Sequence, residues 1–267
     1  MLKNITMGQY IPGNSVLHRA DPRTKIIWTM FLIIALFIAN NIYGYVMMLA
    51  LVGIILVICG VPVSYTLRGI RPLLIILIIT SAINIFAYPG SNVLVSFGSF
   101  RITLEGILQA IIIAVRLSLM VIIGSILTLT TTPIALTDGL EKLLSPLKKI
   151  KVPVHEMAMM MSIALRFIPT LLEETDRIIK AQSSRGADFD TGNFIEKAKS
   201  FIPVLIPLFV NAFKRAEELA TAMESRCYRG DIGRTRMKEL VYTKVDRNIN
   251  IFLIMFYILF ILSTFFI

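Results

Sequence analysis

The chain has 267 residues, of which 56% are hydrophobic and only 16% are charged, and its mean hydropathy is +0.76. This is more apolar surface than one soluble core can bury, so the composition excludes an ordinary soluble domain. The formal net charge of +10 comes without a basic patch interleaved with aromatic residues, which excludes a nucleic-acid partner. We therefore expect an all-α integral membrane protein.

Helices of about 17 to 25 apolar residues can cross the hydrocarbon core of a membrane. Such runs predict five transmembrane helices, at residues 26–40, 42–60, 72–88, 104–131 and 248–267. The first 25 residues carry charges and turn formers, so no secretory signal peptide is expected.

The distribution of Lys and Arg predicts the orientation, because these residues gather in cytoplasmic loops. Residues 1–25 and the loop with Arg68 and Arg71 are basic, and 133–247 holds 19 Lys/Arg against 15 Asp/Glu. Five crossings then place the N-terminus inside and the C-terminus outside. We expect three parts: a membrane part with four spans (1–131), a cytoplasmic region (132–247) and a last transmembrane helix (248–267).

Arg116 falls near the middle of the fourth predicted span, where a charge is costly. It either faces the bundle interior or a partner as a functional group, or forms a structural pair with a polar neighbour such as Asn84. Cys59 lies in a span and Cys227 in a basic segment, and neither has a disulfide partner or metal-ligand spacing. No metal or cofactor is expected in this chain.

The cytoplasmic region is predicted to contain two long amphipathic helices and a shorter one. Apolar positions recur at intervals of three and four over residues 154–184 and 194–223. A shorter helix is expected at 133–149, with Thr132 as its N-cap and Pro133 at the first helical position. Three prolines should kink or break the long helices: Pro169, Pro203 and Pro207.

A short repeat marks the ends of both long helices. The segments AQSSRGADFDTG (181–192) and AMESRCYRGDIG (222–233) share five of twelve positions at an offset of 41 residues, namely Ala181/Ala222, Ser184/Ser225, Arg185/Arg226, Asp190/Asp231 and Gly192/Gly233. Small residues allow another backbone to approach, and Gly186 can take the left-handed conformation that ends a helix. Either the arginines only complement the helix dipoles, or the two ends are paired docking sites.

The chain has no phosphate-binding loop of the form GxxxxGK[ST], so it is not expected to bind ATP or to act as an enzyme. Acidic clusters at 173–176 and 188–190 could in principle hold Mg²⁺. Lys and Arg interleave with them, which favours a solvated helix face instead.

Three stretches, GQYIPGNSVLHRADPRTK (8–25), IALRFIPTLLEETDRIIKAQSSRGAD (163–188) and AMESRCYRGDIGRTRMKEL (222–240), resemble the EcfT family. EcfT, also called CbiQ-like, is the transmembrane component of energy-coupling factor transporters, ABC-type importers of vitamins and transition-metal ions in prokaryotes. The resemblance extends over the whole chain, since the order of the spans and cytoplasmic helices also fits.

The resemblance implies a non-catalytic scaffold in the prokaryotic cell membrane. Its partners would be two ABC-type ATPase subunits, which bind ATP and Mg, and one substrate-capturing membrane protein, the S component. Two X-Arg-Gly signatures of the family, which end its coupling helices and dock on the ATPases, fall here on Ser184-Arg185-Gly186 and Ser225-Arg226-Cys227. Because Cys227 replaces the glycine, the second helix ends either there or at Gly230.

The apolar faces of the coupling helices would contact the S component, through residues that include Leu165, Leu172, Leu205 and Phe209. Three other classes of protein compete with this interpretation. An ordinary ABC permease usually couples through one short helix, and a secondary transporter is expected to carry inverted repeats and ionisable groups in its spans. A membrane transferase needs an aspartate-rich motif next to a span, which the sequence lacks.

Overall fold

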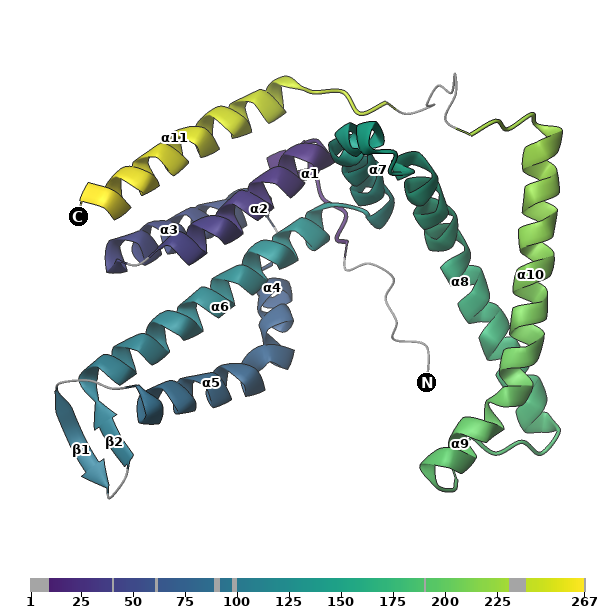
Figure 1. Cartoon of the computed structure of the whole chain (residues 1–267), viewed down its shortest axis with the longest axis horizontal. Helices are drawn as coiled ribbons and strands as arrows, with labels where there is room; N and C mark the ends of the chain where they lie inside the picture. Colours follow the sequence, from purple (N-terminus) through teal and green to yellow (C-terminus); the bar gives the residue numbers. More distant parts are fainter. Residues whose placement is uncertain are drawn as a thin grey trace. The chain divides into compact units, whose positions relative to one another are not determined.

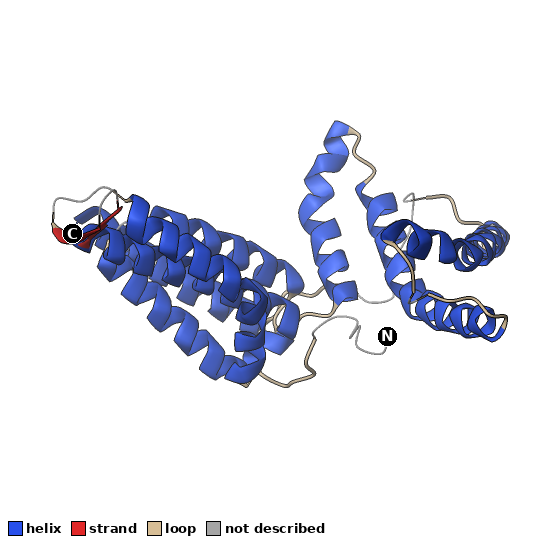
Figure 2. Cartoon of the chain, turned by 90° about the horizontal axis from the view of Figure 1, so that it is seen from below, coloured by secondary structure: helices blue, strands red, loops and turns tan. Residues whose placement is uncertain are grey.

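The computed structural model describes residues 10–39, 41–60, 62–88, 92–97, 100–189, 191–230 and 239–266. Helices dominate, with one short hairpin (Figures 1 and 2), in the order α1 Val16–Arg19, α2 Pro22–Ile38, α3 Ile42–Cys59, α4 Val63–Ile70, α5 Leu74–Ala87, β1 Val93–Phe97, β2 Phe100–Thr103, α6 Leu104–Thr130, α7 Pro133–Leu144, α8 Val154–Ser184, α9 Phe194–Ser200, α10 Ile202–Ser225 and α11 Lys244–Phe266. They form two compact units, a membrane unit (8–142 and 240–267) and a helix-pair unit (143–239).

The membrane unit confirms an all-α membrane protein. Four stretches within the described residues are long and apolar enough to cross a bilayer: Ile42–Cys59, Ser64–Phe86, Leu104–Thr130 and Lys244–Thr264. The first predicted span forms α2, whose 17 residues lie at the lower limit of about 17 for a crossing helix. The predicted N-cap of this helix is confirmed, because Asp21 Oδ1 accepts from the backbone N–H of Arg23 at 2.8 Å.

The third predicted span differs from the structure in its start. It begins before Pro72, with α4, and a 3-10 turn at Arg71–Leu73 joins α4 to α5. Figure 1 shows that α4 and α5 run in different directions. A proline in the first positions of a new turn lacks the N–H that would continue the preceding helix, so Pro72 lies at a bend within the span.

The hairpin was not predicted. Its two strands pair antiparallel, with Phe97 opposite Phe100 and an irregularity between Val93 and Val95. The second strand leads directly into α6, where the hydroxyl of Thr103 accepts from the backbone N–H of Gly106 at 3.1 Å. The hairpin therefore ends where the long helix is capped.

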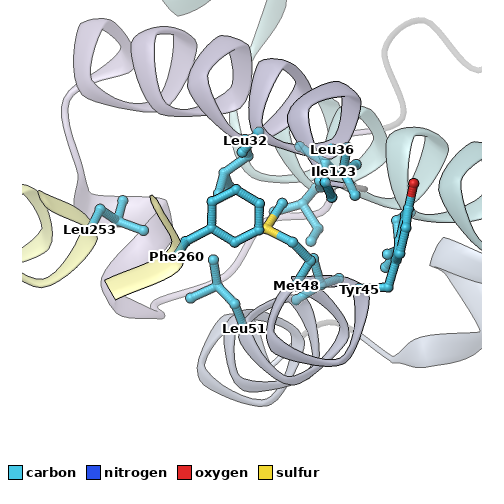
Figure 3. Close-up of a cluster of buried hydrophobic side chains, with 13 residues drawn as sticks. Leu32, Leu36, Tyr45, Met48, Leu51, Ile123, Leu253 and Phe260 are labelled. Carbon is cyan, nitrogen blue, oxygen red and sulfur yellow. The ribbon is translucent and has the colours of Figure 1, made fainter. Parts of the chain in front are cut away.

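Four helices share the core of the membrane unit. Phe260 of α11 and Met48 of α3 are fully buried, and Leu36 of α2 and Ile123 of α6 pack in the same cluster (Figure 3). On the outside of these helices large apolar side chains stay exposed, for example Val57 at 82% and Ile75 at 69%. Such apolar surface on long helices fits contact with lipid.

The start of α11 is tied to the start of α2. Asp246 is fully buried, and its carboxylate accepts from the backbone N–H of Asp21 at 2.6 Å and from that of Thr243 at 2.8 Å. Arg23 also donates to the carbonyl of Leu240 at 3.2 Å. These bonds satisfy backbone groups at the beginnings of both helices.

The helix-pair unit holds the predicted amphipathic helices. Helix α8 has the predicted bounds, whereas the second long helix breaks at Phe201 into α9 and α10, just before Pro203. Pro169 and Pro207 remain inside α8 and α10. Where the shorter helix was expected, α7 begins at Pro133, ends at Leu144 and continues as a 3-10 segment, Ser145–Ile150.

Candidate functional site: two matching helix ends

The first of the two predicted helix ends closes α8. Arg185 caps the helix, and Gly186 has a positive φ of 89°. The backbone N–H of Gly186 donates to the carbonyl of Ser183, and that of Ala187 to the carbonyl of Gln182, both at 3.0 Å. This is the Schellman motif, in which a left-handed residue after the cap lets the chain satisfy the last carbonyls.

The second end, at α10, repeats the motif bond for bond. Cys227 has a φ of 56°, and its N–H donates to the carbonyl of Glu224 at 2.8 Å. The N–H of Tyr228 donates to the carbonyl of Met223 at 3.0 Å. Each bond is the counterpart of one at the first end, shifted by 41 residues. The helix thus ends at Cys227, and Gly230, with a φ of 77°, lies three residues further on.

Both cap residues present a charge to their surroundings. Arg185 and Arg226 are exposed, and within the described residues neither forms an ion pair. The hydroxyls of Ser184 and Ser225 donate back into their own helices at 3.0 Å, to Lys180 and Ala222. A guanidinium with five donors can then bind a carboxylate of another molecule. Three residues of the repeat, Asp190, Asp231 and Gly233, lie outside the described residues.

The two long helices cross at a polar cluster that the sequence analysis assigned to a solvated helix face. Glu174 of α8 accepts from Asn211 Nδ2 at 2.5 Å, and its Oε2 lies 2.8 Å from Arg215 Nη2 of α10, without the angles of a good hydrogen bond. The Glu174 side chain is only 16% exposed. Glu174 therefore joins two helices instead of facing water.

The crossing has the same offset as the helix ends, since 215 minus 174 is 41. A hydrogen bond from Gln182 Nε2 to the carbonyl of Pro203, at 3.5 Å, shows that the two helices run antiparallel. An approximate twofold relation between α8 and α10 accounts for both facts, because a residue near a twofold axis contacts its own counterpart. The two ends therefore lie at opposite ends of the pair (Figure 1).

Helix α10 also carries an exposed apolar stripe. Leu205 is 44% exposed and Phe209 60%, and they continue into further exposed side chains, Ile206, Val210 and Phe213. The two residues predicted for this face on α8, Leu165 and Leu172, are half-buried. The stripe leaves a helical apolar surface available to lipid or to another helix.

Arg116 makes its hydrogen bonds inside the membrane unit. Its Nε donates to the Tyr45 hydroxyl at 2.8 Å, and its Nη2 donates to the same hydroxyl and to the Ala39 carbonyl, at 3.3 Å. The neighbour suggested by the sequence, Asn84, instead donates to Thr80 of its own helix. The structure thus gives Arg116 partners on α3 and at the end of α2, as in the structural alternative.

Among the residues that the structure describes, no group of three or more His, Cys, Asp or Glu side chains could hold a metal ion. The acidic clusters considered for Mg²⁺ are engaged otherwise. Glu174 binds α10, and Asp188 accepts from the backbone N–H of Thr191 at 3.3 Å.

These features define a helical membrane protein with a pair of amphipathic helices ending in matching arginines. A family model described as "Cobalt transport protein" (CbiQ) matches residues 13–239. A relative from Ruminiclostridium cellulolyticum, the energy-coupling factor transporter transmembrane protein EcfT, is 61% identical over 246 residues, 92% of either chain. EcfT of Bacillus subtilis is 46% identical over 95% of this chain and 96% of its own, and that of Lactococcus lactis subsp. cremoris 44% identical over 98% of either. The chain belongs to the EcfT family, as the resemblance implied.

Proposed function

We propose that this chain is the transmembrane scaffold of an energy-coupling factor importer, a subunit without catalytic activity of its own. It would couple ATP hydrolysis by two ATPase subunits to the uptake of a vitamin or metal ion captured by an S component. ATP and Mg would be bound by the ATPases, since the chain has no phosphate-binding loop. Its place would be the prokaryotic cell membrane, with residues 132–247 on the cytoplasmic side.

One observation carries this proposal: two helices end in the same hydrogen-bonded motif, each with an exposed arginine at the cap. An ATPase dimer offers two grooves, and a scaffold that holds both needs two matching ends. Ser184-Arg185-Gly186 would dock in one groove and Ser225-Arg226-Cys227 in the other. The planar guanidinium suits a carboxylate in a groove partly shielded from water.

The crossing supports a mechanism for coupling. When ATP closes the ATPase dimer, its two grooves approach each other and draw the helix ends with them. Because α8 and α10 are joined at Glu174, movement of either end turns one helix against the other. The exposed stripe with Leu205 and Phe209, together with Leu165 and Leu172 of α8, would pass this motion to the S component.

One copurification experiment tests both contacts. Arg185→Glu combined with Arg226→Glu reverses both charges, and each docking contact should lose roughly 2 to 5 kcal/mol. We expect the ATPases to dissociate while the S component stays bound. Leu205→Glu is the matched control with the opposite result, because a charge on the stripe should release the S component and leave the ATPases bound. A complex that keeps all its subunits with both arginines reversed contradicts the docking assignment.

A further inference from the structure

The two helix ends share a backbone motif, but their surroundings differ in charge. Asp188 follows the first end, and its counterpart 41 positions later is Arg229. On the helix that passes beside the second end stands Arg166 of α8, and its counterpart beside the first end is Pro207. The second end therefore combines three guanidinium groups, whereas the first combines one guanidinium with one carboxylate.

The three arginines of the second end line one cavity between α8 and α10. It has a volume of about 640 Å³, and its other lining residues are polar or apolar without a carboxylate: Met159, Ser162, Ile163, Phe167, Leu219, Met223, Cys227, Tyr228 and Gly230. Arg166, Arg226 and Arg229 are all exposed. Three like charges around a partly apolar hollow favour an occupant that brings carboxylates and some apolar surface.

The first end differs in packing at the same position. Phe189 lies there against Phe201, with ring centroids 5.2 Å apart. Its counterpart at the second end is Gly230, which has no side chain and lies in the cavity wall. An aromatic residue thus occupies the first end where the second leaves open space.

We propose that the cavity lined by Arg166, Arg226 and Arg229 is an extended docking surface for an acidic segment of one ATPase subunit. The two ends then fit grooves of different charge, and the scaffold binds two non-identical ATPases in a fixed order. The more acidic groove lies on the second end. This inference rests on the proposed function, because it concerns which ATPase each end receives.

The chain offers a matched pair of probes for this order. Cys227 is exposed at the left-handed position of the second end, and Cys59, the other cysteine, is buried. Gly186→Cys combined with Cys227→Gly moves the thiol to the equivalent position of the first end. Because Cys227 adopts this conformation, cysteine is compatible with it. Ser183→Cys with Cys227→Gly is a second placement near the first end.

The experiment is cross-linking of the intact purified complex with a short thiol-to-amine reagent, followed by mass spectrometry of the linked peptides. Cys227 should link one ATPase and the relocated thiol the other, each with roughly tenfold preference or more. Arg166→Gln with Arg229→Gln should lower the Cys227 product by a similar factor and leave the first end unchanged. Lys197→Gln with Lys214→Gln removes two charges outside the cavity and should change neither product.

Equal linking of both ATPases at both ends, or a complex with one kind of ATPase, would overturn the fixed order while leaving the proposed function intact. An unchanged Cys227 product after Arg166→Gln with Arg229→Gln, with loss of bound anionic phospholipid, would assign the cavity to lipid and overturn the proposal. If no ATPase is linked at either end, the proposed function fails as well.

Discussion

Gly186 and Cys227 occupy the same left-handed position at the two helix ends, with different energetic consequences. Glycine adopts a φ of 89° freely, whereas cysteine at 56° carries the strain of a Cβ close to the following carbonyl, about 1 to 2 kcal/mol. The second end therefore forms its motif against a conformational cost that the first end does not have.

The first prediction concerns this position. Gly186→Ala should destabilise the end of α8 by about 1 kcal/mol, since it introduces the Cβ that Gly186 lacks. Backbone amides of residues 186 and 187 should then exchange with solvent roughly fivefold faster, measured by hydrogen exchange in detergent or nanodiscs. Cys227→Gly is the control and should not accelerate exchange at 227 and 228. Unchanged exchange in Gly186→Ala would show that the motif does not depend on this residue.

Other residues of the site could be predicted only in part. The repeat identified both arginines and the small residue before each, because helix ends are determined by nearby sequence. The partner of Arg116 is 71 positions away, at Tyr45, and only the packing of α3 against α6 brings the two together. The signal for Glu174 and Arg215 was present in the offset of 41, as opposite charges at counterpart positions, but its use requires knowing that the helices cross.

At the scale of elements, the crossing of α8 and α10 depends on a small number of polar contacts. Glu174 binds Asn211 and Arg215, and the Arg215 side chain is 33% exposed, so solvent weakens the ion pair. With the carboxylate 16% exposed, the contact should still contribute about 1 to 3 kcal/mol. Fixing the crossing here lets the two helix ends move in a coordinated way.

The second prediction tests this contact by charge exchange. Glu174→Arg should repel Arg215 and broaden the distances between α8 and α10, measured by electron paramagnetic resonance with spin labels at Lys180 and Glu217. Combining it with Arg215→Glu should restore much of the native distribution, because the pair is re-formed in the opposite sense. Asp176→Arg, one helical turn segment away on α8, is the charge-matched control. If the double variant is no closer to native than the single one, the pair does not hold the crossing.

Element boundaries followed the sequence where local signals were strong. The bounds of α8 agree with its periodicity, and the start of α7 with its N-cap, where the Thr132 hydroxyl accepts from Ala135 at 3.3 Å. The bend at Arg71–Leu73 and the hairpin at 93–103 were missed. A proline begins a helix or bends one equally well, and strands of four or five residues give too short an alternation to detect.

At the scale of the whole molecule, the number of crossings decides on which sides of the membrane the ends of the chain lie. Helix α2 is the critical one, since its 17 residues extend about 25 Å, slightly less than a hydrocarbon core of about 30 Å. If α2 crosses with the four longer stretches, the count is five and the termini lie on opposite sides. If α2 stays at one surface, the count is four and both termini share a side.

The last prediction is that the C-terminus lies outside. Basic residues near the start of the chain, Arg19, Arg23 and Lys25, and the excess of Lys and Arg over 133–247 both favour the cytoplasm. With α2 crossing, α11 then runs outward from Lys244 to Phe266. Alkaline phosphatase fused after residue 267 should be active, because it folds outside, and green fluorescent protein fused there should stay dark. The same reporters fused after Gly230, between the second helix end and α11, serve as the control and should give the opposite pattern. A fluorescent C-terminal fusion with an inactive phosphatase would place both ends of the chain on the cytoplasmic side and show that one of the five helices, with α2 the first candidate, does not cross.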